Sequence, residues 1–134
     1  MITVKIVEND ISTVAKAIIV DDSRRVLFLK RSKYTDKYAG EWDLPGGHLK
    51  ENEGLEAGLK REVREESGLE IENLTFFKKL DNLHFFHCKY DSQPVSLSHE
   101  HTDYRFLDKK DLNRAEKFQK LALQVIEALE DHND

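Results

Sequence analysis

This chain has 134 residues, a length that predicts one domain over residues 1–134 with room for a buried core. Its 21 lysines and arginines against 26 aspartates and glutamates leave a net charge of −5, which argues against a nucleic-acid polymer or an anionic membrane as partner. The single cysteine, Cys88, excludes an intramolecular disulfide. Because the sequence has no apolar run near about 18 residues and no leader-like start, we expect a cytoplasmic protein.

The first part of the chain predicts strands and turns. Thr13–Val20 and Val26–Leu29 are rich in β-branched and large apolar residues, and the polar turn at Asp21–Ser23 predicts that they pair as an antiparallel hairpin. A polar loop follows from Arg31 to Glu41. Trp42–Gly47 then indicates a short extended piece that is ended by a proline and two glycines.

The middle of the chain predicts a helix from about Leu55 to Ser67. Asn52 is the expected N-cap, and Gly68 is placed to end the helix in the left-handed conformation. Leu59 and Val63 follow Leu55 at helical spacing, so this face should pack on a sheet.

Two further strands are expected at Leu74–Leu80 and Leu83–Tyr90, with weaker strand signals at Val95–Leu97 and Tyr104–Leu107. A final helix is indicated by apolar residues at helical spacing, namely Phe118, Leu121, Ala122, Val125, Ile126 and Leu129. Asn113 and Glu116 predict a capping box before it. Strands interleaved with two amphipathic helices predict an α/β fold, with a mixed sheet covered on two sides.

Three carboxylates are concentrated on the predicted middle helix. Glu62, Glu65 and Glu66 stand at positions i, i+3 and i+4, which places them on one face. Carboxylates crowded together repel one another, and a hard divalent cation with oxygen ligands relieves that repulsion. This face is therefore a candidate metal site.

The segment from Gly47 to Leu69 resembles the Nudix box, the signature of the Nudix hydrolase family. That pattern is Gly, five residues, Glu, seven residues, Arg-Glu, an aliphatic residue, any residue, Glu-Glu, any residue, Gly and an aliphatic residue. Its fixed positions are filled by Gly47, Glu53, Arg61, Glu62, Val63, Glu65, Glu66, Gly68 and Leu69. The resemblance implies a Nudix-type α/β/α sandwich with a mixed β-sheet and a hydrolase that cleaves a pyrophosphate linkage.

The resemblance also implies a metal site for Mg²⁺, with Mn²⁺ as a possible substitute. Glu62 and Glu66 are the expected core ligands. Glu65 is expected either to bind the metal itself or to contact the residues that do. A backbone carbonyl of the Gly46-Gly47 loop is expected to join them. Such ions neutralise the diphosphate and lower the pKa of an attacking water.

Other residues are expected to support this chemistry. Arg61 and Glu53 should form an ion pair that supports the metal ligands, and Arg61 should assist catalysis by orienting Glu62. Glu100 occupies a loop where many Nudix enzymes carry a further glutamate, so it is a candidate ligand or general base. The base remains open at this point between Glu100, Glu62 and Glu65.

A small-molecule nucleotide is the expected partner. Candidate contacts with the base or the phosphates are Arg31, Tyr34, Trp42, Phe86 and His101. The sequence motifs that are typical of several Nudix subfamilies, outside the box, are not found in this chain. The layout is most similar to MutT-like enzymes, which cleave (deoxy)nucleoside triphosphates to a monophosphate and pyrophosphate.

Alternatives to that function remain open. Within the family they are an ADP-ribose or nucleotide-sugar pyrophosphatase and a non-catalytic Nudix-fold module that senses a nucleotide. The alternative outside the family is an interaction domain that binds a partner through the last helix. A zinc site built from histidines near Cys88 is disfavoured because they lack a zinc-ligand spacing. A homodimer is compatible with this interpretation.

Overall fold

The computed structural model describes residues 13–35 and 38–131. Its elements in chain order are β1 (Val14–Val20), β2 (Val26–Arg31), β3 (Trp42–Asp43), β4 (Gly46–His48), α1 (Leu55–Ser67), β5 (Thr75–Leu80), β6 (Leu83–Lys89), β7 (His101–Leu107) and α2 (Lys117–Asp131). Neither helix in these residues is long and apolar enough to cross a bilayer.

All the strands belong to one mixed sheet. The strand order is β3-β2-β1-β6-β5, with β4 paired to β1 and β7 paired to β2. β1 runs parallel to β6, whereas the pairs β1–β2, β1–β4, β2–β3, β2–β7 and β5–β6 are antiparallel. The predicted α/β fold with a mixed sheet is therefore confirmed.

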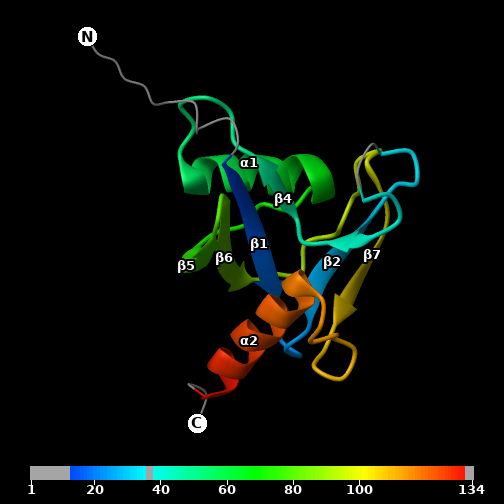
Figure 1. The fold of residues 1–134 in the computed structure, drawn as a ribbon, viewed down its shortest axis with the longest axis vertical. Helices are drawn as coiled ribbons and strands as arrows, with labels where there is room; N and C mark the ends of the chain where they lie inside the picture. Colours follow the sequence, from blue (N-terminus) through cyan, green and yellow to red (C-terminus); the bar gives the residue numbers. More distant parts are fainter. Residues whose placement is uncertain (1–12, 36–37, 132–134) are drawn as a thin grey trace.

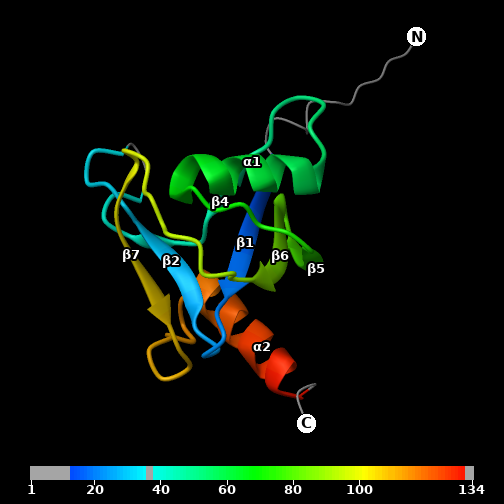
Figure 2. The ribbon, with the colours of Figure 1, turned by 180° about the vertical axis from the view of Figure 1, so that it is seen from behind.

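The two helices cover opposite faces of the sheet (Figures 1 and 2). Successive side chains of a strand point to opposite faces, so β1 serves both cores. Ala15, Ala17 and Ile19 pack in the core beneath α1, which supplies Leu59 and Val63. The second core, beneath α2, contains Ile18, Val20, Val26, Phe28, Leu44, Phe85, Leu112, Leu121, Ala122, Leu123, Val125 and Ile126.

The β1–β2 hairpin opens into a fork. The two strands are in register at Val20 and Val26, beside their turn. Towards the open end, Val14–Lys16 of β1 pair with β4, while Leu29 and Lys30 of β2 pair with β3. Residues Leu44 and Pro45, between β3 and β4, therefore cross from one arm of the fork to the other. This crossing brings the glycines after Pro45 against β1.

Several local predictions require correction. The predicted extended piece at Trp42–Gly47 is two short strands, and Val95–Leu97 is not a strand. Asn52 does not cap α1: it lies in a left-handed turn at φ 66°, and Gly54 is the N-cap with no side-chain hydrogen bond. Gly68 does end the helix in the left-handed conformation, at φ 76°.

The cap of α2 also differs from the predicted box. The Glu116 carboxylate accepts a hydrogen bond from the backbone N–H of Gln119, at 2.9 Å. The Gln119 side-chain oxygen accepts one from the N–H of Asn113, at 2.9 Å. The backbone N–H of Glu116 also donates to the carbonyl of Asn113, at 3.1 Å. Asn113 and Glu116 therefore both help to cap this helix, but their side chains do not form the reciprocal pair of a capping box.

Candidate active site

Arg61 is the centre of the acidic face of α1. Its Nη1 donates to Glu62 Oε2 at 3.1 Å and to Glu65 Oε1 at 3.0 Å. Its Nη2 also donates to the backbone carbonyl of His48, at 3.2 Å, which ties the helix to β4. One guanidinium thus holds two of the three clustered carboxylates in place.

The predicted pairing of Arg61 with Glu53 is present and is bidentate. Nε and Nη2 of Arg61 lie 2.7 and 2.9 Å from the two carboxylate oxygens of Glu53. The hydrogen bond from Arg61 lowers the pKa of Glu53 to about 2, and the backbone N–H of Lys50 acts in the same direction. Because a planar fork matches a carboxylate in two places, this pair orients the guanidinium that contacts Glu62.

Glu66 lies deeper than its neighbours and faces the Gly46 backbone. It is 8% exposed, and its Oε1 accepts a hydrogen bond of 2.9 Å from the N–H of Gly46. Burial raises the pKa of Glu66 to about 8, although that hydrogen bond and the charge of Lys16 oppose the rise. Burial also raises the pKa of Glu62, against the opposing charge of Arg61.

The two glycines at the end of the fork meet different surroundings. A Cβ at Gly46 would lie 2.1 Å from the backbone oxygen of Ala15, and the φ of Gly46 is 132°. A Cβ at Gly47 would lie 2.6 Å from Oε1 of Glu62. Gly46 is therefore needed for the close approach to β1, whereas Gly47 leaves room for the Glu62 carboxylate.

A buried ion pair beside these carboxylates was missed by the sequence analysis. Lys16 is 8% exposed, and its Nζ lies 3.1 Å from both carboxylate oxygens of Asp43. Arg31 approaches the same carboxylate, with Nη1 3.8 Å from Oδ2 of Asp43. A lysine inside the apolar run TVAKAIIV was the available signal, because a charged residue there requires a buried partner.

His101 begins β7 and pairs in register with Arg31. It is 5% exposed, and its Nδ1 is buried without a hydrogen-bond partner. Burial lowers the pKa of His101, an effect that the nearby charge of Asp43 opposes. The predicted substrate residues Arg31 and His101 thus lie together around Asp43.

Glu100 lies on an exposed turn that is attached to both α1 and β2. The backbone N–H of Ser98 donates to the carbonyl of Glu66 at 3.0 Å, and the N–H of Ser32 donates to the carbonyl of Glu100 at 2.8 Å. The Glu100 side chain is exposed to solvent. The structure therefore fixes the backbone of this loop to the end of the acidic helix.

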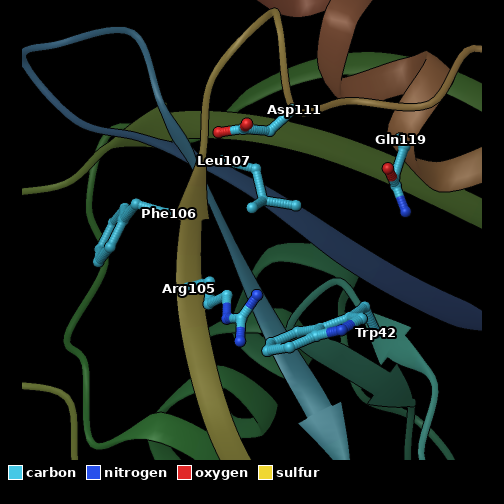
Figure 3. Close-up of a pocket in the computed structure, with 6 residues that line it drawn as sticks. All are labelled: Trp42, Arg105, Phe106, Leu107, Asp111 and Gln119. Atoms are coloured by element: carbon cyan, nitrogen blue, oxygen red, sulfur yellow. The ribbon is translucent and has the colours of Figure 1, made fainter.

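A cavity of about 550 Å³ opens on the α2 side of β7, lined by Trp42, Arg105, Phe106, Leu107, Asp111 and Gln119. Figure 3 shows Phe106 on the opposite side of β7 from Leu107 and Trp42. The Arg105 guanidinium carbon lies 5.1 Å from the centre of the Trp42 ring. The cavity offers an aromatic surface together with charged and amide groups.

The remaining aromatic candidates lie elsewhere. Phe86 is 3% exposed and packs edge-to-face on Phe76, with the ring centres 5.5 Å apart. Its ring therefore belongs to the core beneath α1 and is withdrawn from substrate. Tyr34 lies on the turn after β2 and is 84% exposed.

Carboxylate oxygens are the ligands that a hard divalent cation takes, and the acidic face of α1 offers those of Glu62, Glu65 and Glu66. Among residues 13–35 and 38–131, no three His, Cys, Asp or Glu side chains converge closely enough to hold a metal. Arg61 holds Glu62 and Glu65, while Glu66 is held by the Gly46 N–H. Burial raises the pKa of Glu62 and of Glu66 more than the nearby Arg61 and Lys16 lower it, and a positive charge among these oxygens would favour their ionised forms.

Comparisons with known proteins find similar sequences along most of this chain. Residues 12–129 match the NUDIX domain family. The chain is 30% identical over 121 residues to an 8-oxo-dGTP diphosphatase of Buchnera aphidicola subsp. Acyrthosiphon pisum, and the match covers 83% of this chain and 92% of that protein.

Solved structures share the fold. The MutT protein from Methanosarcina mazei Go1 matches with a TM-score of 0.69 and 23% identity, over 91% of this chain and 95% of the other. A C. elegans Ap4A hydrolase in a binary complex matches with a TM-score of 0.71 and 21% identity, over 90% and 99%. At these identities the two matches establish a common architecture.

Proposed function

We propose that this chain, which belongs to the NUDIX domain family and is a nucleotide pyrophosphohydrolase, acts on (deoxy)nucleoside triphosphates. Water and the triphosphate would yield a nucleoside monophosphate and pyrophosphate. The observation that carries the substrate class is the Buchnera relative, which is aligned over most of both chains and is called an 8-oxo-dGTP diphosphatase. We therefore place 8-oxo-dGTP first among the substrates to be tested.

In this proposal, oxygen ligands from α1 and the glycine segment would hold Mg²⁺, with Mn²⁺ as a possible substitute. The proposed ligands are Glu62, Glu66, Glu65, Glu100 and the backbone carbonyl of Gly47. The Gly46 carbonyl lies 3.4 Å from Lys16 Nζ, so it would need its second lone pair to join them. When bound, the ion supplies charge neutralisation for the phosphates and a lowered pKa for an attacking water. The close contact between Gly47 and the Glu62 carboxylate supports this grouping.

We assign Arg61 and Glu53 to positioning the Glu62 carboxylate. The bidentate pair fixes the plane of the guanidinium, and Nη1 then fixes Glu62 Oε2. Groups that orient a ligand in this manner typically contribute about 10–100-fold to metal affinity or activity.

For the substrate, we assign the cavity beside Trp42 to the nucleobase, since an aromatic ring provides a stacking surface. Arg31 at the end of β2 and His101 at the start of β7 lie near the Asp43 carboxylate, and we assign them to the phosphates. The clustering of Arg31 and His101 around Asp43 supports this assignment.

The first experiment is a hydrolysis panel with Mg²⁺ in H₂¹⁸O, with the products resolved by chromatography and ³¹P NMR. It contains 8-oxo-dGTP, canonical (d)NTPs, ADP-ribose, nucleotide sugars and dinucleoside polyphosphates, each run beside Glu62→Gln. We expect triphosphates to give monophosphate and pyrophosphate, and the variant to lose that activity. Preference for ADP-ribose would overturn the substrate, and binding without cleavage across the panel would favour a nucleotide sensor.

We propose Glu100 as the general base. Glu62 and Glu65 both accept hydrogen bonds from Arg61, so each has an oxygen already engaged, whereas the Glu100 side chain is exposed to solvent. Glu100→Gln should therefore lower kcat by about 10²–10⁴-fold. Because this side chain is exposed, the melting temperature should stay close to that of the wild type. A variant that turns over at the wild-type rate would return the role of base to Glu62 or Glu65.

A further inference from the structure

Lys16 is a buried cation with a full set of acceptors. Its side chain is 10% exposed, and Nζ lies 3.1 Å from both carboxylate oxygens of Asp43. The same nitrogen lies 3.2 Å from the carbonyl oxygen of Leu44 and 3.4 Å from that of Gly46. The ammonium group has three protons, so these acceptors occupy its hydrogen-bonding capacity.

These contacts span the fork of the sheet. Lys16 lies on β1, whereas Asp43 lies on β3, which pairs with β2. Leu44 belongs to the segment that crosses between the two arms, and Gly46 is the first residue of β4, where that segment ends. Lys16 therefore connects both arms of the fork and the carbonyls of Leu44 and Gly46 through one nitrogen atom.

The crossing segment controls a backbone group of the acidic site. Gly46 directs its carbonyl towards Lys16 and donates its N–H to Glu66 Oε1, at 2.9 Å. Gly46 has no side chain through which its orientation could be held, and its φ of 132° is open chiefly to glycine. The peptide group that carries this N–H is tied to β1 by the Pro45 carbonyl, which accepts a hydrogen bond of 2.8 Å from the N–H of Ala17. Lys16 contacts the carbonyls on both sides of that peptide group.

We propose that Lys16 is a positioning residue: it holds the Leu44–Gly46 segment so that the Gly46 N–H meets Glu66. The proposal rests on the proposed function, in which Glu66 works at the hydrolytic centre. Neutralising Asp43 would need only the carboxylate contact, and a buried ion pair is often no more stable than apolar residues of similar volume. The two carbonyl contacts account for a cation at this position because they set the geometry of the backbone.

The test compares Lys16→Met with the double variant Lys16→Met/Asp43→Asn. Methionine keeps the length of the side chain and removes the donors, so the single variant leaves Asp43 without its lysine. The double variant also removes the Asp43 charge, which in the single variant is balanced only by Arg31 at 3.8 Å, and so should recover the melting temperature lost by the single variant. The matched control is Lys78→Met, because Lys78 is a half-buried lysine on β5 that contacts Gln124 and the Phe77 ring.

Two measurements report on position. The chain has 6 glycines, so a ¹⁵N-glycine-labelled NMR spectrum is simple enough to follow hydrogen exchange at the Gly46 amide. Steady-state kinetics on the best triphosphate of the panel separate kcat from KM. In both Lys16 variants we expect the Gly46 amide to exchange at least tenfold faster and kcat to fall about 10–100-fold, with KM changed less than threefold.

The double variant decides the question. If it recovers its melting temperature while Gly46 exchange stays fast and kcat stays low, the positioning role holds. If wild-type Gly46 exchange and kcat return together, Lys16 only neutralises Asp43 and the proposal is overturned. Should the wild type cleave no nucleotide, the proposed function fails, but Gly46 exchange still decides what Lys16 does.

Discussion

Glu66 is a carboxyl group that burial turns into a weak acid, with a pKa raised to about 8 from an ordinary value near 4.5. Between these two values the folded protein keeps a proton that the unfolded chain has lost, so stability falls as pH rises. In the metal-free wild type, we expect the free energy of unfolding to decrease from pH 5 to pH 8 by roughly 4 kcal/mol from this group. Denaturation in EDTA across this range measures it.

Glu66→Gln is the control for this pH dependence of stability. The amide stays neutral, so the part of the pH dependence that arises from Glu66 should disappear, and at pH 8 the metal-free variant should be more stable than the wild type. Mg²⁺ added at pH 8 should stabilise the wild type more than the variant, because the proposed metal binds the ionised carboxylate. Identical pH profiles for the two proteins would refute the assignment of a raised pKa to Glu66.

At the scale of elements, β4 depends on two adjacent glycines for different reasons. Gly46→Ala places a Cβ on the backbone oxygen of Ala15 at a φ that alanine rarely adopts. We expect it to lower the free energy of unfolding by about 2–5 kcal/mol, because the β1–β4 pairing must open. Chemical denaturation gives this value directly.

Gly47→Ala is the matched variant one residue along β4. Its Cβ meets the carboxylate of Glu62, the far end of a flexible side chain that can turn away. The fold should lose less than about 1 kcal/mol, while hydrolysis falls because Glu62 is displaced. Equal losses of stability in the two variants would contradict this division of roles between the glycines.

The strands and helices of this chain were easier to predict than the caps of its helices. The hairpin at Thr13–Leu29 and the helix from Leu55 have strong periodic patterns, and both are present. The cap of α1 was misplaced because Asn52 suits either an N-cap or a left-handed turn. Only the path of the chain from β4 decides between them, and it places Asn52 in the turn, at φ 66°.

At the scale of the whole molecule, the sheet separates two hydrophobic cores, of which the one beneath α1 supports the acidic site. Leu59 of α1 and Ile126 of α2 are both fully buried. Leu59→Ala and Ile126→Ala should each cost about 2–5 kcal/mol in stability. At a temperature where both variants remain folded, only Leu59→Ala should raise the Mg²⁺ concentration for half-maximal activity, because it loosens α1 against β4.

Titration of activity with Mg²⁺, run beside thermal melts, separates the two effects. An equal change in Mg²⁺ dependence in both variants would mean that the two cores respond as one unit. A change confined to Leu59→Ala would show that the site depends on the helix–sheet contact that carries the carboxylates.

Residue patterns were enough to predict the mixed α/β fold, the acidic helix and the family, because these depend on periodicity and on a contiguous motif. The pairing of Glu53 with Arg61 was also predictable, since both residues are fixed positions of that motif. The tertiary structure alone decided that Lys16 and Asp43 form a buried pair and that Phe86 belongs to the core. Those facts depend on how the fork in the sheet brings distant segments together, and no local pattern of residues encodes that geometry.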